Sequence, residues 1–427
     1  MKVSCKFKGN KLYFESKSDK IDEKIGKKRG NSSCFIELPF NDISKIHPDH
    51  IGLASILLFH PFIGKEIELP FDVSKDFYIA ADSVLSRYKI TSNYSENIKP
   101  WSAPKDSLPG LAFSAGQDSM AALAIMPEET VSIFLDRPPE GQTQYRSDAA
   151  VEACERLKEV GYHVLKIKSD LEHLRSPVGF PSDLANGVPL ILMAKELHLD
   201  SIAFGTVLES AYGIGHEAYR DYKNNAHHRF YGTIFSAAGL EKNLPVAGIS
   251  EVSTTIINSK SSIGNYAQSC IRGEWRRPCH MCWKCFRKDL LAESLKMKLP
   301  TSDIASTLIS NEVQINLSQN PISHENVILY AIQRLDLSDY PYLLKLSNRV
   351  SQDIELGCLN KWFWHSLELV PLKYQKIIRD KILDYIPAMN EHEIENIIQW
   401  NMNNFINNNE TIINQDKLIN WLAQIKW

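Results

Sequence analysis

Two short groups of residues in this sequence have types and spacings suited to chemistry. The first is the turn Ser114-Ala115-Gly116-Gln117-Asp118-Ser119. It follows an apolar run that ends at Phe113 and leads into a helical stretch from Met120. Small residues at such a turn let backbone N–H groups approach an anion, and the helix N-terminus adds partial positive charge. This pattern favours a phosphate site, although a turn in which Ser and Asp only cap the helix has the same spacing.

The second group is a cluster of cysteines near the middle of the chain. It consists of Cys270, Cys279, Cys282 and Cys285, with the spacing C-x8-C-x2-C-x2-C. Four thiolates with two short spacings suit tetrahedral zinc, and a site filled by sulfur is expected to be structural. An iron–sulfur cluster is the alternative, but the ferredoxin run continues with a fourth Cys and Pro, whereas Phe286 follows Cys285. We therefore favour zinc.

Composition limits the class of protein. The chain has 427 residues, of which 44% are hydrophobic and 23% are charged, as in soluble globular proteins. Its 48 basic and 51 acidic residues give a net charge of −3, so no overall basic field indicates nucleic-acid binding. No apolar run approaches the roughly 20 residues that a membrane-spanning helix needs. Because clustered thiols favour metal over disulfides, we expect a cytoplasmic protein that contacts neither membrane nor nucleic acid.

The pattern of apolar residues changes twice along the chain and predicts three regions. Residues 1–105 are expected to form an N-terminal α+β accessory module, in which the alternation from Val3 to Phe14 predicts a β-hairpin. Residues 106–295 alternate strand candidates with helix candidates. Residues 296–427 carry amphipathic helical patterns and are expected to form a C-terminal helical domain.

The middle region has the pattern of a parallel sheet covered by helices on both faces. Strands are predicted at 110–114, 131–136, 163–168, 201–205 and 245–249, with helices at 119–125, 147–160, 189–197 and 231–238. In such sheets ligands bind beyond the carboxyl ends of the strands. The turn 114–119, Asp136 and Gly205 all fall at that edge, so we expect them to share a ligand site.

In their order and separation, these motifs resemble those of a known enzyme superfamily. The turn is similar to the pyrophosphate loop S-G-G-x-D-S of the PP-loop ATP pyrophosphatases, which have the adenine-nucleotide α-hydrolase-like fold. Within that superfamily, the four cysteines and Phe134-Leu135-Asp136 resemble those of the QueC-like family, the 7-cyano-7-deazaguanine synthases. The resemblance covers about residues 108–292. With additions on both sides, the chain resembles the QueC-like members of two kinds of bacterial antiphage defence system, Qat and type IV CBASS.

The resemblance implies a Rossmann-like parallel sheet and an adenylating activity. Such enzymes use Mg²⁺ and cleave ATP between the α and β phosphates to adenylate a carboxylate, here that of 7-carboxy-7-deazaguanine. AMP then leaves when an amine attacks, and in the defence systems this amine is the N-terminus of a partner protein, expected from the same operon. Two alternatives stay open. One is synthesis of 7-cyano-7-deazaguanine from ammonia for tRNA or DNA modification, and the other is a non-catalytic nucleotide-binding scaffold.

The resemblance also assigns roles to individual positions. The catalytic positions are Ser114, Asp118 and Ser119, and the ATP-binding positions are Ser114, Ala115, Gly116, Gln117, Asp118, Ser119, Asp136 and Gly205. Glu209 and Glu217 are assigned to the substrate, since Glu217 could pair with the N–H edge of a guanine-like base. Ala115 departs from the family pattern because it replaces the first loop glycine, and we expect it to keep an ordinary negative φ.

Overall fold

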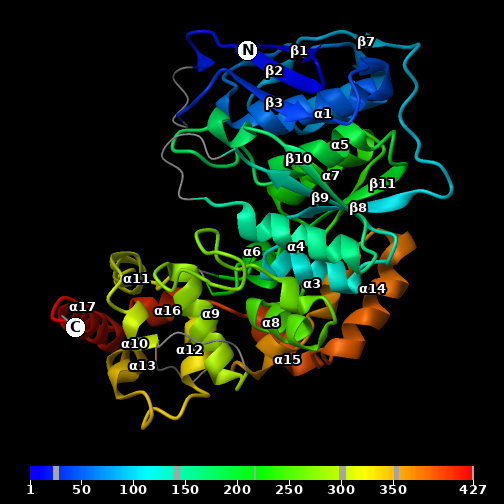
Figure 1. Ribbon diagram of the computed structural model, residues 1–427. Helices are drawn as coiled ribbons and strands as arrows, with labels where there is room; N and C mark the ends of the chain where they lie inside the picture. Colours follow the sequence, from blue (N-terminus) through cyan, green and yellow to red (C-terminus); the bar gives the residue numbers. More distant parts are fainter. Residues whose placement is uncertain (23–27, 139–144, 216–217, 298–303, 351–354, 426–427) are drawn as a thin grey trace.

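The structure, a computed structural model, describes residues 1–22, 28–138, 145–215, 218–297, 304–350 and 355–425 (Figure 1). The N-terminal strands lie at one end of the molecule, a parallel β-sheet lies in the middle, and the last helices lie at the other end. The prediction of an α/β sheet followed by a helical region is therefore confirmed.

Five parallel strands form the central sheet. They are β8 (Leu108–Phe113), β9 (Val131–Asp136), β10 (Val164–Lys168), β11 (Leu199–Phe204) and β12 (Glu241–Asn243). Their order across the sheet is β10-β9-β8-β11-β12, and all neighbours are parallel. The first three strands thus extend in one direction, and the chain then crosses to the other side of β8. This makes the carboxyl ends of β8 and β11 the topological switch point, where open α/β sheets bind ligands.

Helices cover both faces of the sheet (Figure 1). On one face lie α5 (Val188–Met193) and α7 (Ala226–Ala237), with α1 (Pro48–Phe59) packed on α5. On the other face lie α3 (Gln117–Ile125) and α4 (Asp148–Glu159), with α8 (Glu251–Lys260) and α14 (Leu372–Tyr385) packed against α3. Successive residues of β8 pack into different layers, since Ala112 belongs to the core on the α5 side and Leu111 and Phe113 to the core on the α3 side. The near-continuous apolar strands follow from this burial on both faces.

The fifth strand lies earlier in the sequence than predicted. The predicted stretch 245–249 is a buried turn that leads into α8, and Glu241–Asn243 forms the strand instead. The backbone of the turn pairs with the C-terminal region, where Phe363 N–H donates to Gly248 O at 2.9 Å. Its apolar residues are therefore buried by a segment far away in the sequence, which a strand pattern does not reveal.

The N-terminal region begins with a three-stranded antiparallel sheet, β1 (Lys2–Lys8), β2 (Lys11–Lys17) and β3 (Ser33–Glu37), as the hairpin pattern predicts. Its inward side chains, among them Leu12, Phe14 and Ile36, are fully buried. They belong to the same apolar core as α1 and α5. The remaining elements of this region are β4 (Glu66–Ile67), β5 (Val73–Ser74), α2 (Lys75–Val84), β6 (Lys89–Ile90) and β7 (Tyr94–Ser95).

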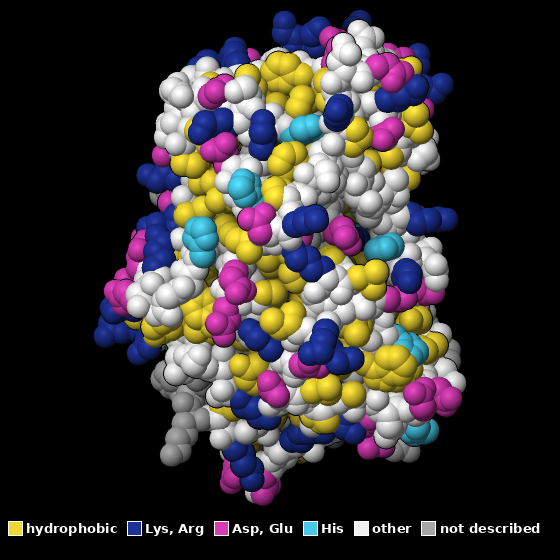
Figure 2. Space-filling model, turned by 90° about the vertical axis from the view of Figure 1, so that its right-hand side faces the viewer, with side chains coloured by type: hydrophobic (Ala, Val, Ile, Leu, Met, Phe, Trp, Pro, Cys, Tyr) yellow, Lys and Arg dark blue, Asp and Glu magenta, His cyan; other side chains and the backbone are white. Residues whose placement is uncertain are grey.

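The rest of the chain is helical. Its helices are α6 (Leu208–Tyr212), α9 (Trp283–Ser294), α10 (Ile304–Thr307), α11 (Asn311–Leu317), α12 (Glu325–Ile332), α13 (Leu344–Val350), α15 (Glu391–Ile398), α16 (Asn403–Ile406) and α17 (Asn409–Leu422). In the described part of the chain, no helix has both the length and the apolar character needed to cross a membrane. Figure 2 shows basic, acidic and apolar side chains interspersed over one face of the molecule.

Candidate functional site

The turn 114–119 forms the start of α3 at the switch point of the sheet. Gly116 is the residue before the helix, with φ −78° and ψ 171°, and no side chain caps the helix there. The N–H groups of the first helical turn, which have no partners within a helix, therefore lack a capping side chain as well. Ser and Asp side chains therefore do not cap this helix, and its first N–H groups stay available to another acceptor.

The two serines of the turn stabilise it from inside. Ser119 Oγ accepts from Ser114 N–H at 3.2 Å and donates to Gly116 O at 3.2 Å, and the two serine hydroxyls lie 3.0 Å apart. Ser119 is buried. Both residues were expected to contact phosphate, and in this structure their hydroxyl groups bond to the turn itself.

Ala115 has a left-handed backbone, and the expectation of an ordinary φ is wrong. Its φ is +57°, its side chain is fully buried, and its carbonyl accepts from Gln268 N–H at 2.6 Å. A non-glycine residue pays about 1–2 kcal/mol for this conformation. The turn thus keeps a backbone geometry that favours glycine, even though the glycine of the family pattern is missing.

Gly205 and Asp136 lie at the same edge of the sheet as the turn. A Cβ on Gly205 would lie 3.2 Å from Ser119 N, so the absence of a side chain lets the end of β11 approach the start of α3. Phe113, the last residue of β8, pairs with Phe134 of β9, and Asp136 follows two residues later. The structure therefore brings both positions to the edge where the sequence predicts them.

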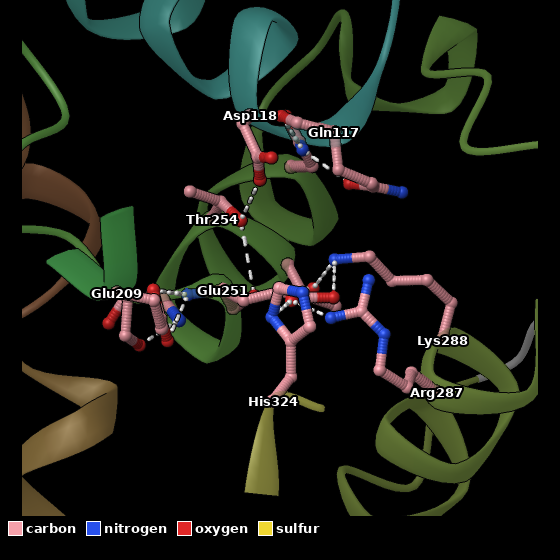
Figure 3. Close-up of polar contacts among 12 residues, drawn as sticks. Gln117, Asp118, Glu209, Glu251, Thr254, Arg287, Lys288 and His324 are labelled. Carbon is pink, nitrogen blue, oxygen red and sulfur yellow. Dashed lines mark hydrogen bonds and ion pairs between the residues drawn. The ribbon is translucent and has the colours of Figure 1, made fainter. Parts of the chain in front are cut away.

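Asp118 and Gln117 are held by α8 (Figure 3). Thr254 Oγ1 donates to Asp118 Oδ1 at 3.0 Å, and Asn258 Nδ2 donates to Gln117 O at 2.8 Å. Thr254 and Asn258 are buried. Sequence reasoning missed both residues, because a Thr and an Asn within a helix match no motif and act here only through the packing of α8 against α3.

The four cysteines converge, and their geometry fits a metal ion. Their sulfur atoms all lie within 4.8 Å of one another, with Cys282 and Cys285 3.5 Å apart and Cys279 and Cys285 3.8 Å apart. Four sulfurs at about 2.3 Å from a central zinc ion have S–S distances of about 3.8 Å. Backbone N–H groups of Cys279 and Cys285 also point at Cys270 Sγ and Cys282 Sγ, both at 3.4 Å. A buried site of this kind is suited to a metal such as zinc.

Helix α9 connects the cysteines to the rest of the site. Cys282 is the N-cap residue directly before it, and the Cys282 side chain accepts from Cys285 N–H. Two positive residues farther along α9 reach Glu251 at the start of α8: Arg287 Nη1 lies 2.8 Å from Oε2, and Lys288 Nζ lies 3.0 Å from Oε1 (Figure 3). His324 Nδ1 lies 3.4 Å from the same Oε2. The cysteine segment and α8 are therefore joined by buried charges.

Glu251 and Glu209 are neighbouring buried carboxyl groups with different electrostatics. Burial raises the pKa of Glu251, but Lys288, Arg287 and His324 outweigh burial and hold it well below its ordinary value. No cation among the described residues lowers the pKa of Glu209 in this way, and burial, followed by the charge of Glu251, raises it to about 7. The two carboxyl groups thus have pKa values shifted in opposite directions by their surroundings.

Of the two predicted substrate residues, the structure describes only Glu209, and it does not bring this residue to an open site. Both carboxyl oxygens of Glu209 accept from Glu251 N–H at 3.1 Å, and Asn326 Nδ2 donates to Oε1 at 3.0 Å. Glu209 is fully buried, and its carboxyl group accepts from the first N–H group of α8. Glu217 lies outside the described residues.

A cavity of about 430 Å³ lies between the turn 114–119 and the cysteines. Its lining includes Gln117 at the start of α3, Asn258 of α8, Cys270 of the cluster, and the basic residues Arg276 and Lys288. Ligand pockets commonly measure about 300–1,000 Å³. The cavity is therefore large enough for a small molecule placed between the two motifs.

Comparison with known proteins gives one match. The model of a family of unknown function, DUF6395, matches residues 230–401, which is less than half of the chain. The matched stretch contains α8, the four cysteines and α9, and it excludes the turn 114–119. Neither the curated proteins nor the solved structures include a match to this chain.

Proposed function

We propose that this protein is a QueC-like, ATP-dependent ligase that adenylates the carboxylate of 7-carboxy-7-deazaguanine and transfers the acyl group to an amine. The observation that carries the proposal is the uncapped N-terminus of α3 at the switch point between β8 and β11. Helix N-termini at switch points are suited to nucleotide phosphates, because unpaired N–H groups and the helix dipole both favour negative charge.

The residues around the turn fit ATP and Mg²⁺ by the chemistry of their donors. First-turn N–H groups of α3 would donate to phosphate oxygens, and the lack of a side chain on Gly116 leaves their approach open. Asp118 and Asp136 supply carboxylates at the same edge, and carboxylates with phosphates are the ligands that Mg²⁺ prefers. Mg²⁺ bound there would offset phosphate charge.

The proposed reaction has two steps. The carboxylate oxygen attacks the α-phosphorus of ATP, the bond to the bridging oxygen breaks, and pyrophosphate leaves with the electron pair. The amine then attacks the acyl carbon, AMP leaves, and the amine loses a proton. No nucleophilic side chain is needed, since the protein contributes position and charge stabilisation.

The metal expected at the four cysteines is zinc in a structural role. Because its four positions would be filled by sulfur, it would stabilise the start of α9 and the wall of the cavity. The acceptor amine is proposed to be the N-terminus of a partner protein from the same operon. A protein acceptor needs a surface to dock on. Residues 1–105 and 296–427, on either side of the PP-loop-like part, could supply it, which supports this choice.

The test is to incubate the full chain with ATP, Mg²⁺, 7-carboxy-7-deazaguanine and an amine acceptor, either ammonium or the partner protein, and to measure AMP and pyrophosphate. We expect both products only when the acid is present, and loss of both in Asp118→Asn but not in the surface control Asp148→Asn. ATP binding without turnover would instead support the scaffold. Mass spectrometry of products with ammonia, and of the co-expressed partner protein, separates nitrile synthesis from conjugation, because only conjugation increases the mass of the partner.

A further inference from the structure

Lys284 brings a positive charge from the cysteine segment to the phosphate turn. It is the second residue of α9 and lies between Cys282 and Cys285. Its Nζ lies 3.9 Å from the position that a Cβ would take on Gly116. Two motifs that are far apart in the sequence therefore meet at one point, the N-terminus of α3.

The ammonium group of Lys284 differs from three basic residues of the same region, which are all held in ion pairs. Arg272 pairs with Glu312, and Arg287 and Lys288 pair with Glu251. Among the residues that the structure describes, Lys284 Nζ has no hydrogen bond or ion pair, and the side chain is partly buried. A cation beside the positive end of a helix is unfavourable unless an anion lies there too.

A second, independent feature beside the turn also points to a ligand. Asn258 is 5% exposed and lines the cavity with Gln117, to which its Nδ2 donates. Among the residues that the structure describes, none bonds to its Oδ1 or to Ser269 Oγ on the cavity wall, and both atoms are buried. Buried polar atoms without partners are uncommon and costly in proteins, and they are expected where a ligand or water completes the site.

We infer that Lys284 binds the phosphate group of the ligand held at the N-terminus of α3, so that the four-cysteine segment forms part of the anion site. The inference rests on the proposed function and adds to it a residue that no motif contains. Lys284 lies between two proposed metal ligands, Cys282 and Cys285, so the cluster fixes its backbone. Its side chain then extends to the turn 114–119.

The test uses inorganic pyrophosphate with Mg²⁺ as the probe and calorimetric titration of the metal-loaded full chain. Lys284→Met is compared with the conservative Lys284→Arg and with Arg277→Met, which removes a charge from an exposed position of the same segment. We expect Lys284→Met to weaken binding about 10- to 100-fold, the range for a hydrogen bond to a charged group. Lys284→Arg should retain most of the affinity, and Arg277→Met should bind like the wild type.

Thermal unfolding without ligand separates binding from a structural role. Removing an unpaired cation beside a helix N-terminus should leave the unfolding temperature of Lys284→Met unchanged or higher, whereas a structural lysine would lower it. Equal pyrophosphate affinity in Lys284→Met and the wild type would overturn the inference and leave the proposed phosphate site intact. Absence of pyrophosphate binding by the wild type would overturn both.

Discussion

At the scale of single residues, the turn 114–119 combines two neighbouring positions with opposite requirements. Ala115 is in the left-handed region, where a side chain is strained, and Gly116 has an ordinary φ, where a side chain is tolerated. The strained backbone thus lies at Ala115, whereas the residue that leaves room for the proposed ligand is Gly116. Substitutions at these two positions should therefore have different consequences for stability and for binding.

Gly116→Ala should leave the fold intact and weaken the binding of ATP or pyrophosphate by about tenfold or more. The new Cβ would lie 3.3 Å from Ser114 Oγ and 3.9 Å from Lys284 Nζ, in the space that a phosphate needs. Ala115→Gly is the matched control. It relieves the left-handed strain, changes the free energy of unfolding by about 1 kcal/mol or less, and should keep binding. Calorimetry and urea unfolding measure both effects, and unaltered affinity in Gly116→Ala would contradict the phosphate site.

Glu209 should make the stability of the protein depend on pH. Because its pKa is about 7 in the folded protein against an ordinary value of 4.5, the folded state holds a proton that the unfolded state has lost between these values. The contribution of Glu209 to the free energy of unfolding is therefore fully present below about pH 4.5 and is lost as the pH rises through 7. Glu251, whose pKa is lowered, acts in the opposite direction and only at more acidic pH.

The measurement is the unfolding temperature of the wild type and of Glu209→Gln between pH 5 and pH 8. The amide keeps the shape of the carboxyl group but does not titrate. We expect the wild type to lose stability relative to Glu209→Gln as the pH rises through 7. A constant difference between the two proteins over this range would show that Glu209 does not titrate there.

At the scale of elements, α9 is the helix that connects the four-cysteine cluster to the other motifs. It begins within the cysteine cluster and reaches the N-terminus of α8 through Arg287 and Lys288, and α8 in turn holds Asp118 and Gln117. We therefore expect loss of a metal ion from the cysteines to disturb α8 and its contacts with Asp118 and Gln117, as well as the turns that hold the cysteines.

Cys282→Ser should lower the metal content from about one zinc ion per chain and lower the unfolding temperature, because a structural zinc site contributes folding free energy. Cys358→Ser is the matched control, since Cys358 is also buried but lies outside the cluster. It should keep the metal and lose less stability. Elemental analysis and a thermal scan check the prediction, which fails if both variants retain equal zinc and equal stability.

The sequence predicts local elements better than the contacts between them. Four of the five strands follow from apolar runs, and the cysteines follow from their spacing. The fifth strand is misplaced because the turn at Gly248 is buried by Phe363, more than 100 residues later. Thr254, Asn258 and Lys284 could not be found as site residues, since their roles arise from helix packing and no pattern in a single sequence records it.

At the scale of the whole molecule, the strand order explains why distant motifs meet. The reversal between β8 and β11 opens one edge of the sheet, and the turn, Gly205 and α8 gather there. The cysteine segment then lines the cavity opposite Gln117 and α8 through residues such as Cys270, Arg276 and Cys285. A proposed nucleotide site and a proposed metal centre thus form one continuous region rather than two.

The most direct test of the central claim is carboxylate-dependent exchange of labelled pyrophosphate into ATP. Adenylation is reversible, so an enzyme that forms an acyl-adenylate incorporates labelled pyrophosphate into ATP without any amine acceptor. We predict exchange with ATP, Mg²⁺ and 7-carboxy-7-deazaguanine together, none without the acid, and none in Asp118→Asn. Absence of exchange in a metal-loaded wild-type protein that binds both ATP and the acid would contradict the claim.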